Sequence, residues 1–160
     1  MLTLIGTDHL SVLGLGSYVL IFELPRERVI EVGKLGRHAF PFGFYAYVGS
    51  ALGPGGLAAR VKHHLYGISR PHWHIDYLRE VTRPDRLWFV ESDLLLEHAW
   101  GGILPLLNCA SQSMTGFGSS DCKCQTHLFH FRKRPSIRSF QKLAGDRLPD
   151  SPPVRSLKLD

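Results

Sequence analysis

Residues 43–64 read GFYAYVGSALGPGGLAARVKHH and predict a strand, a glycine-rich turn and the beginning of a helix. Residues 44–48 alternate between two faces and are rich in aromatic and β-branched side chains, which is typical of a strand. Residues 49–56 contain four glycines and one proline, so they exclude a helix interior and allow a ligand to approach the backbone closely. From residue 57 onward, apolar side chains recur at steps of four, which favours a helix: Leu57, Val61 and Leu65.

Three polar side chains of this segment have the chemistry of a phosphate site. Tyr47 lies near the end of the predicted strand, and Arg60 and His64 share one helix face at a step of four. The planar guanidinium of an arginine binds two phosphate oxygens at once. From residue type alone, however, a strand tyrosine more often packs in a core and a helix arginine more often lies on the surface. The segment therefore predicts a phosphate site whose detailed roles need further support.

Five motifs in chain order resemble the GIY-YIG endonuclease superfamily, and the last two resemble its Uri-type branch. They are GSYVL at 16–20, YVGS at 47–50, RVKHH at 60–64, HWHIDYL at 72–78 and GFGSSDC at 116–122. The first motif departs from the family pattern, because it begins Gly-Ser-Tyr rather than Gly-Ile-Tyr. The resemblance implies a mixed α/β (α+β) fold in which helices flank a small, central, three-stranded antiparallel sheet. It also implies a metal-dependent endonuclease that hydrolyses phosphodiester bonds of DNA, single-stranded and structured DNA included.

The resemblance also implies which residues are catalytic: Tyr18, Tyr47, Arg60, His64, His72 and Glu97. Either tyrosine would activate the attacking water, and Arg60 would stabilise the charge that develops at phosphorus. His64, His72 or His74 would transfer a proton or bind phosphate, and packing or capping is the alternative for each. The expected substrate-binding residues are Gly49, Ser50 and His74, together with Arg132, Lys133 and Arg134.

Glu97 is the acidic residue of the apolar stretch LLLEHAW at 94–100. A carboxylate in an apolar helix costs free energy unless a partner satisfies it, and a magnesium ion is such a partner. The resemblance likewise implies one helix glutamate as the ligand of Mg²⁺ or Mn²⁺. A solvent-facing helix position is the alternative, and Glu91 and Asp93 are nearby candidates for the same role.

Cys122, Cys124 and His127 form a Cys-x-Cys-x-x-His pattern that has three ligands for a structural zinc ion. His98 or Cys109 would supply the fourth ligand. His98 stands where the Uri-type branch is expected to have a cysteine, directly after the helix glutamate. Reduced, buried cysteines that hold no metal are the alternative.

The composition is that of one ordinary globular domain, with 160 residues, 44% hydrophobic and 21% charged. No apolar run reaches the ~18 residues of a membrane span, and no basic region precedes the first apolar stretch, so we expect neither a membrane helix nor a signal peptide. An odd number of cysteines, three, favours a reducing compartment over a disulfide framework. We therefore expect a cytoplasmic protein, whose oligomeric state the sequence leaves open.

The net charge of +5 comes from the last part of the chain. Residues 1–131 contain 11 basic and 11 acidic side chains, whereas residues 132–160 contain 8 basic and 3 acidic ones. We divide the chain into a lead-in at 1–12, the nuclease-like domain at 13–131 and a basic, proline-containing tail at 132–160. The tail favours a polyanionic partner such as DNA, and a solvated terminus with little packed structure is the alternative.

Patterning predicts strands at 17–24, 29–32 and 43–49, the second of which would form a hairpin arm. Helices are expected at 57–67, 73–81 and 94–107, a short strand or connector at 86–90, and a last strand at 127–131. Residues 37–42 and 115–126 are expected to be loops. Two functions compete with the nuclease: a catalytically silent nucleic-acid-binding module of the same fold, and a zinc-stabilised domain that binds a protein through its tail.

Overall fold

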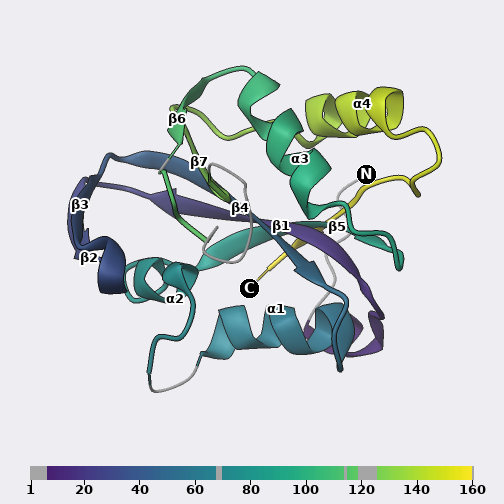
Figure 1. Cartoon of the computed structure of the whole chain (residues 1–160), viewed down its shortest axis with the longest axis horizontal. Helices are drawn as coiled ribbons and strands as arrows, with labels where there is room; N and C mark the ends of the chain where they lie inside the picture. The colour runs from purple at the N-terminus through teal and green to yellow at the C-terminus, as the bar shows by residue number, and fades with distance from the viewer. Residues whose placement is uncertain (1–6, 68–69, 114, 119–125, 160) are drawn as a thin grey trace.

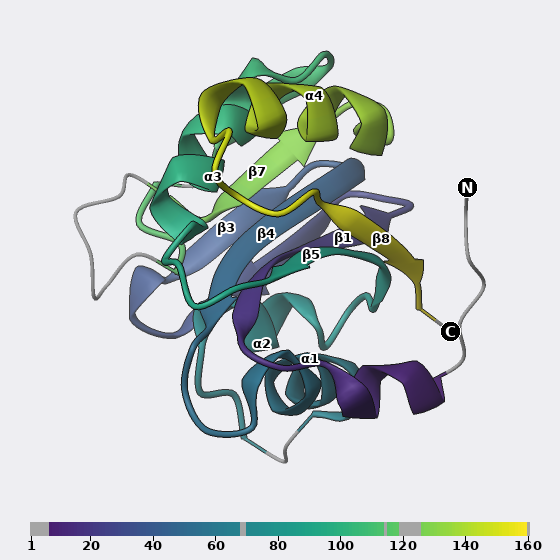
Figure 2. The ribbon, with the colours of Figure 1, turned by 90° about the vertical axis from the view of Figure 1, so that its right-hand side faces the viewer.

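The protein is built on a six-stranded antiparallel sheet with helices on both faces (Figures 1 and 2). The computed structural model describes residues 7–67, 70–113, 115–118 and 126–159. The strands lie in the order β6-β7-β4-β1-β5-β8. Their bounds are β1 (Gly16–Leu24), β4 (Gly43–Ala51), β5 (Pro84–Glu91), β6 (Ala110–Ser113), β7 (Leu128–Phe131) and β8 (Arg155–Lys158).

The remaining elements cover the two faces of this sheet. On one face lie α1 (Gly56–Tyr66), α2 (His74–Leu78) and a separate hairpin of β2 (Arg28–Glu31) and β3 (Arg37–Phe40) with the short turn η2 (Gly33–Leu35) between its strands. On the other face lie α3 (Glu97–Ile103), η3 (Leu104–Leu106) and α4 (Ile137–Arg147), while η1 (Thr7–Val12) lies against α1. Figure 1 shows α1 and α2 on one side of the strands and α3 and α4 on the other.

The alternation of β1 explains this two-sided cover. Tyr18, Leu20 and Phe22 point into the core under α1 and α2, whereas Val19 and Ile21 point into the core under α3 and α4. All five side chains are at most 1% exposed. A strand that is apolar on both faces is stable only when both faces are covered, so the two helical layers follow from this pattern.

The mixed α+β class is confirmed, but the expected three-stranded sheet is wrong. The strands predicted at 17–24 and 43–49 are present as β1 and β4, and β5 extends the segment predicted at 86–90. The hairpin arm at 29–32 is β2, yet it pairs with β3, which forms in the predicted loop, and not with the main sheet. Both edges of the β1–β4 pair carry further strands, because a pair buried on both faces leaves its outer backbone groups unsatisfied.

The three expected helices are present, the first shifted by one residue and the other two shorter than predicted. The first one is α1, which ends where predicted, since Gly67 follows it with a positive φ of 70°. The segment predicted at 73–81 forms only α2, and the one at 94–107 forms α3 followed by η3. The first helix was the most regular in its apolar spacing, and its bounds were accordingly the best predicted.

The expectation of little packed structure after residue 132 is wrong. Phe140 of α4 is fully buried, and its ring centroid lies 5.2 Å from those of Trp88 and Trp100. Strand β8 pairs with β5 through four residues and so forms one edge of the main sheet. Of the prolines that suggested an unpacked tail, Pro149, Pro152 and Pro153 lie in the turn between α4 and β8, and Pro135 precedes α4. Across the described residues, no helix combines the length and the apolar character that a membrane crossing requires.

We predict that Phe140→Ala lowers the free energy of unfolding by about 3–5 kcal/mol, because it opens a cavity between two tryptophans. Denaturant unfolding followed by tryptophan fluorescence measures the change. Arg138→Ala, at an exposed position of the same helix, is the control and should change it by less than about 0.5 kcal/mol. Equal stability of the two variants would show that α4 contributes nothing to the core.

Candidate functional site

The candidate site lies where β4 runs into the glycine-rich turn. Strand β7 accompanies β4 only as far as Tyr47, and the last bond between them runs from the Val48 N–H to the His127 carbonyl, at 3.0 Å. Beyond that point no described strand pairs with this edge of β4, and the beginnings of α1 and α3 flank it (Figure 1). A side chain at Gly49 would lie 2.5 Å from the Tyr18 ring, so glycine is required for the two strands to hold that ring.

Tyr18 and His64 form a buried pair behind the site. The Tyr18 hydroxyl lies 2.8 Å from His64 Nε2, and both side chains are only 1% exposed. Burial, helped by the neighbouring Tyr47, raises the pKa of Tyr18 well above its usual value. Burial, with a smaller contribution from His63, lowers the pKa of His64 to about 3. Near neutral pH both groups are therefore uncharged, and His64 has no imidazolium proton to donate.

Tyr47 is in the same electrostatic situation. It is 8% exposed, and its ring packs against His64 and Phe117. Burial and then the charge of Glu97 raise its pKa, and Arg60 lowers it by a smaller amount. A neutral phenol can donate a hydrogen bond to phosphate or position a water, but it is a poor base.

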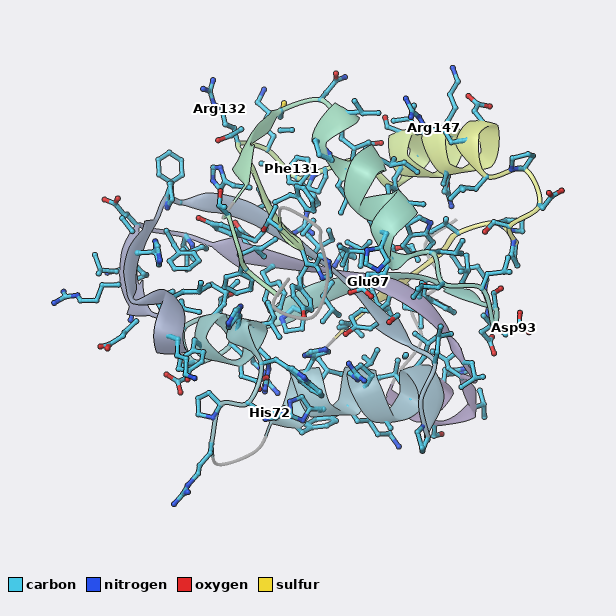
Figure 3. The ribbon with its side chains drawn as sticks, in the orientation of Figure 1. His72, Asp93, Glu97, Phe131, Arg132 and Arg147 are labelled. Carbon is cyan, nitrogen blue, oxygen red and sulfur yellow. The ribbon has the colours of Figure 1, made fainter. Side chains whose placement is uncertain are left out.

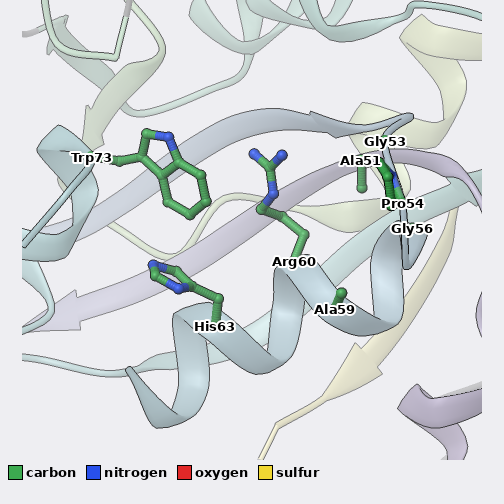
Figure 4. Close-up of a pocket in the computed structure, with 8 residues that line it drawn as sticks. All are labelled: Ala51, Gly53, Pro54, Gly56, Ala59, Arg60, His63 and Trp73. Carbon is green, nitrogen blue, oxygen red and sulfur yellow. The ribbon is translucent and has the colours of Figure 1, made fainter. Parts of the chain in front are cut away.

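Arg60 is the cation of the site. Its guanidinium lies 4.5 Å from the centre of the Trp73 ring and near the Tyr18 hydroxyl, where its charge partly offsets the rise that burial causes in the pKa of that phenol. Figure 4 shows the side chain rising from α1 between Trp73 and the glycine-rich turn. It helps to enclose a pocket of about 160 Å³, whose lining residues are Ala51, Gly53, Pro54, Gly56, Ala59, Arg60, His63 and Trp73.

Among the described carboxylates, Glu97 acts most strongly on the pKa values of the two tyrosines. It begins α3, where its Oε1 lies 2.9 Å from His127 Nδ1 and its carboxylate lies near Ser50. Burial would raise its pKa, but the contacts with His127 and Ser50 outweigh burial and hold the pKa below its usual value. The group is therefore ionised, and its side chain is 16% exposed. Within the described residues, no group of three or more potential metal ligands comes together.

Of the two alternatives to Glu97, Glu91 is already bonded to other residues, and Asp93 lies apart from Glu97. Glu91 forms an ion pair with Arg155 and accepts a hydrogen bond from the Gly14 N–H. Asp93 is exposed on the loop before α3, and Figure 3 shows it well apart from Glu97. The structure therefore favours Glu97 among the three carboxylates.

The other predicted histidines lie around the site and not at its centre. The His72 side chain is exposed, and its backbone N–H donates to the Asp76 carboxylate at 2.8 Å. His74 Nδ1 accepts a hydrogen bond from the Gly118 N–H at 2.8 Å, and its ring packs on Phe117. Burial lowers the pKa of His74. His74 therefore holds the loop that covers Tyr47.

The basic residues Arg132, Lys133 and Arg134 are not brought to the site. They follow β7, whose last residue is paired with Phe44 at the opposite end of β4 from Ser50. Six residues of extended strand separate these ends by about 20 Å. Arg134 is also engaged, with bonds of 3.0 and 2.6 Å to the Asp85 carboxylate, whereas Arg132 and Lys133 are exposed.

The zinc hypothesis falls largely outside the described residues, because Cys122 and Cys124 are not among them. The rings of His98 and His127 have centroids 6.1 Å apart, and Cys109 is exposed with a positive φ of 66°. Zinc therefore stays a prediction, which metal analysis of the purified protein tests directly.

The sequence analysis missed one pair of site residues, His63 and Asp76. His63 lines the pocket beside Arg60, and its Nε2 lies 3.1 Å from Asp76 Oδ1. A signal for His63 was available, because residues three apart on a helix share a face and His63 follows Arg60 at that step. The partner Asp76 comes from another element, so no spacing rule pointed to it.

One family model matches the chain, over residues 17–148, and its description is "Domain of unknown function DUF123". No curated protein and no solved structure matches the chain. The assignment to the GIY-YIG superfamily is therefore wrong, since the matching family is a different one. The motifs behind that assignment are short, and they describe a strand, a glycine turn and a helix, a local geometry that unrelated folds also need.

We predict that His64 makes the protein less stable as the pH falls below 6.5, its ordinary pKa. Between pH 6.5 and about pH 3, the unfolded chain binds a proton at His64 that the folded chain does not bind. The free energy of unfolding therefore decreases as the pH falls through this range. The slope due to this one group is at most about 1.4 kcal/mol per pH unit. Denaturant unfolding at several pH values above and below 6.5 measures it.

His64→Gln should flatten this slope, and His72→Gln, at an exposed position, is the matched control that should leave it unchanged. An unaltered slope in His64→Gln would contradict the assignment of a buried, neutral His64.

Proposed function

The chain belongs to the DUF123 family, whose description names no activity, and we propose from the site alone that it is a metal-dependent phosphodiesterase of nucleic acid. The observation that carries the proposal is Arg60. Its guanidinium is fixed by Trp73 and Tyr18 beside a pocket, yet within the described part of the chain it has no carboxylate partner. A held but unpaired guanidinium at a pocket is suited to a phosphate.

Glu97 supports the same proposal from the other side of the two tyrosines. Both Arg60 and Glu97 act on the pKa of Tyr18 and of Tyr47, in opposite directions, so the cation and the anion lie near the same two phenols. An ionised, partly exposed carboxylate fits one divalent cation, because Mg²⁺ takes few protein carboxylates and keeps several waters. Glu97 would hold Mg²⁺ or Mn²⁺, and when bound the ion would neutralise charge on the phosphate.

The residues of the chain then have distinct tasks in hydrolysis. Arg60 binds the phosphate and stabilises the negative charge that grows on its oxygens as water attacks. The Tyr18 hydroxyl lies beside the Arg60 guanidinium, and His64 holds Tyr18 through its Nε2. Tyr47, a neutral phenol beside Glu97, orients either phosphate or water by donating a hydrogen bond.

Trp73 favours nucleic acid over a small phosphodiester. Its ring lies at the pocket with His63 at 4.5 Å and His72 at 5.3 Å between ring centroids, so aromatic surface adjoins the phosphate-binding cation. Nucleobases stack on such surfaces without regard to sequence. DNA is the first substrate to test, and the cytoplasm remains the expected location because of the three cysteines.

A silent nucleic-acid-binding module is the second candidate. The observation in its favour is that Tyr18, Tyr47 and His64 are all held in the neutral state, so none of the three is set to move a proton. A binding module needs only the cation and the aromatic surface of the same site.

We predict that the protein cleaves labelled DNA or RNA in the presence of Mg²⁺ or Mn²⁺ and not with a chelator. Arg60→Ala and Glu97→Gln should each lower kcat/KM by about 10²–10³-fold, because each removes charge stabilisation at the phosphate. Lys62→Ala, at an exposed position of the same helix, is the control and should retain full activity. Single-stranded and duplex substrates are compared under the same conditions.

Binding without cleavage by the unsubstituted protein would select the binding module. If Glu97→Gln cleaves as well as the unsubstituted protein, the protein is still a phosphodiesterase, but Glu97 is not its metal ligand.

We predict that the basic residues after β7 act only on long substrates. Because they lie about 20 Å from Ser50, a ligand must span that distance to reach both. Replacing Arg132 and Lys133 together by alanine should reduce the salt dependence of binding by about 2 units for a long duplex, and leave a very short oligonucleotide unaffected. Fluorescence anisotropy over a salt series measures the slope. An equal change of the salt slope for the long duplex and the short oligonucleotide would contradict the separation of Arg132 and Lys133 from the site.

A further inference from the structure

We propose that His63, oriented by Asp76, is the base that accepts the proton of the attacking water at this site. The inference rests on the proposed phosphodiesterase function and adds the proton acceptor that the tyrosines and His64 do not provide. Its basis is a histidine–carboxylate pair that joins the pocket to the buried core.

The position of His63 fits this task. It follows Arg60 by three residues on α1, and both side chains line the same pocket (Figure 4). Its side chain is 17% exposed, and its ring centroid lies 4.5 Å from that of Trp73 in an edge-to-face arrangement. The ring therefore reaches the pocket while one of its nitrogens faces the interior.

Asp76 fixes the hydrogen on that inner nitrogen. Its carboxylate is 3% exposed, and its Oδ2 accepts the backbone N–H groups of His72 and Trp73 at 2.8 and 2.9 Å. Burial would raise the pKa of Asp76, but these two N–H groups and His63 outweigh burial and keep it below the usual value. An ionised carboxylate only accepts hydrogen bonds, so His63 Nε2, 3.1 Å from Oδ1, carries the hydrogen.

This hydrogen bond leaves His63 able to act as a base. A neutral imidazole with its hydrogen on Nε2 has an unprotonated Nδ1, which is the acceptor form. The carboxylate stabilises the positive charge that develops when Nδ1 takes a proton, and it keeps the ring from turning. Arg79 lies 3.6 Å from the same carboxylate oxygen and holds it from the other side.

The surroundings of His63 contain few other groups that titrate. From α1 it faces Arg60 and the neutral His64, whose ring centroid is 5.6 Å away. On its other side, the charged groups near His63 are Asp76 of α2 and Arg79, which directly follows α2. His72, in the loop before α2, lies beyond Trp73. His64 is bonded to Tyr18 and His74 to the Gly118 N–H, so neither has the environment of His63.

The step balances as an addition of water across one phosphodiester bond. The oxygen of water forms a bond to phosphorus, and its O–H bond breaks as the proton passes to His63 Nδ1. The bond from phosphorus to the leaving sugar oxygen breaks, and that oxygen keeps the electron pair and takes a proton from solvent. His63 then returns its proton to solvent, and Arg60 carries the charge on the phosphate throughout.

A purely structural role for the pair is the competing explanation, because the Asp76 carboxylate also caps α2. The test therefore compares His63→Gln and Asp76→Asn with the unsubstituted protein over a range of pH, using DNA and Mg²⁺, with Lys62→Gln as the matched exposed control. We expect His63→Gln to lower kcat by about 10²–10⁴-fold with little change in KM, and to abolish the slope of about one on the acid side of the profile of kcat/KM against pH.

A second variant separates catalysis from folding. His63→Ala should bind DNA as the unsubstituted protein does, and added imidazole should restore part of its cleavage rate in proportion to the imidazole concentration. Asp76→Asn should lower kcat without changing the affinity for DNA, because it loses the orientation of the ring and not the phosphate contact.

The outcomes distinguish this inference from the proposed function. If His63→Gln keeps the kcat and the acid slope of the unsubstituted protein while Arg60→Ala loses activity, the base is not His63 and the phosphodiesterase stands. If His63→Ala is inactive, folded and not rescued by imidazole, the pair is structural and the inference fails. If the unsubstituted protein cleaves no nucleic acid with any metal, both fail together.

Discussion

The burial of β1 on both faces is the constraint on which the rest of the structure depends. Its central side chains have no exposed surface, so each face needs a helical layer and each edge needs a neighbouring strand. The layers also approach β1 closely. A side chain at Gly16 would meet the Leu57 side chain at 2.7 Å, and one at Gly56 would meet the Gly14 carbonyl at 2.5 Å. These glycines let the beginning of α1 sit directly beside β1, which brings Arg60 to Tyr18.

Residues from the helical layers on both faces of the sheet contribute to the site. The two phenols and Arg60 belong to the face covered by α1, whereas Glu97 comes from α3 on the other face. The two sides meet because β7 leaves β4 after Tyr47, so no described strand pairs with this edge at the end of β4. Buried, neutral groups hold the charged ones in place: His64 fixes Tyr18, and Tyr18 fixes Arg60. The charged side chains of the site lie at the end of the sheet and not inside the core. The site therefore adds little desolvation free energy to the core.

Sequence reasoning succeeded where local spacing decides the structure. The alternation of β1 and β4, the steps of four in α1 and the stop at Gly67 are read within one element, and the same spacing correctly placed Arg60 and His64 on α1. It failed where partners come from distant segments. Nothing near residue 155 indicates that it pairs with β5, nothing near His63 points to Asp76, and the prolines beyond Arg147 concealed a packed helix. The family was misjudged for the same reason, because each motif reported only its own local geometry.

The edge position of β8 has a consequence for the making of the protein. The chain is synthesised from its N-terminus, so the core around α1 and α2 is available to fold well before residues 155–158 leave the ribosome. Until then one edge of β5 has no partner. The apolar face that Phe140 covers stays open until α4 has been synthesised, shortly before β8. An open strand edge beside bare tryptophans is a template for intermolecular pairing. The nascent chain is thus exposed to intermolecular pairing until α4 and β8 have been synthesised, so the speed of translation through residues 137–158 is part of its folding.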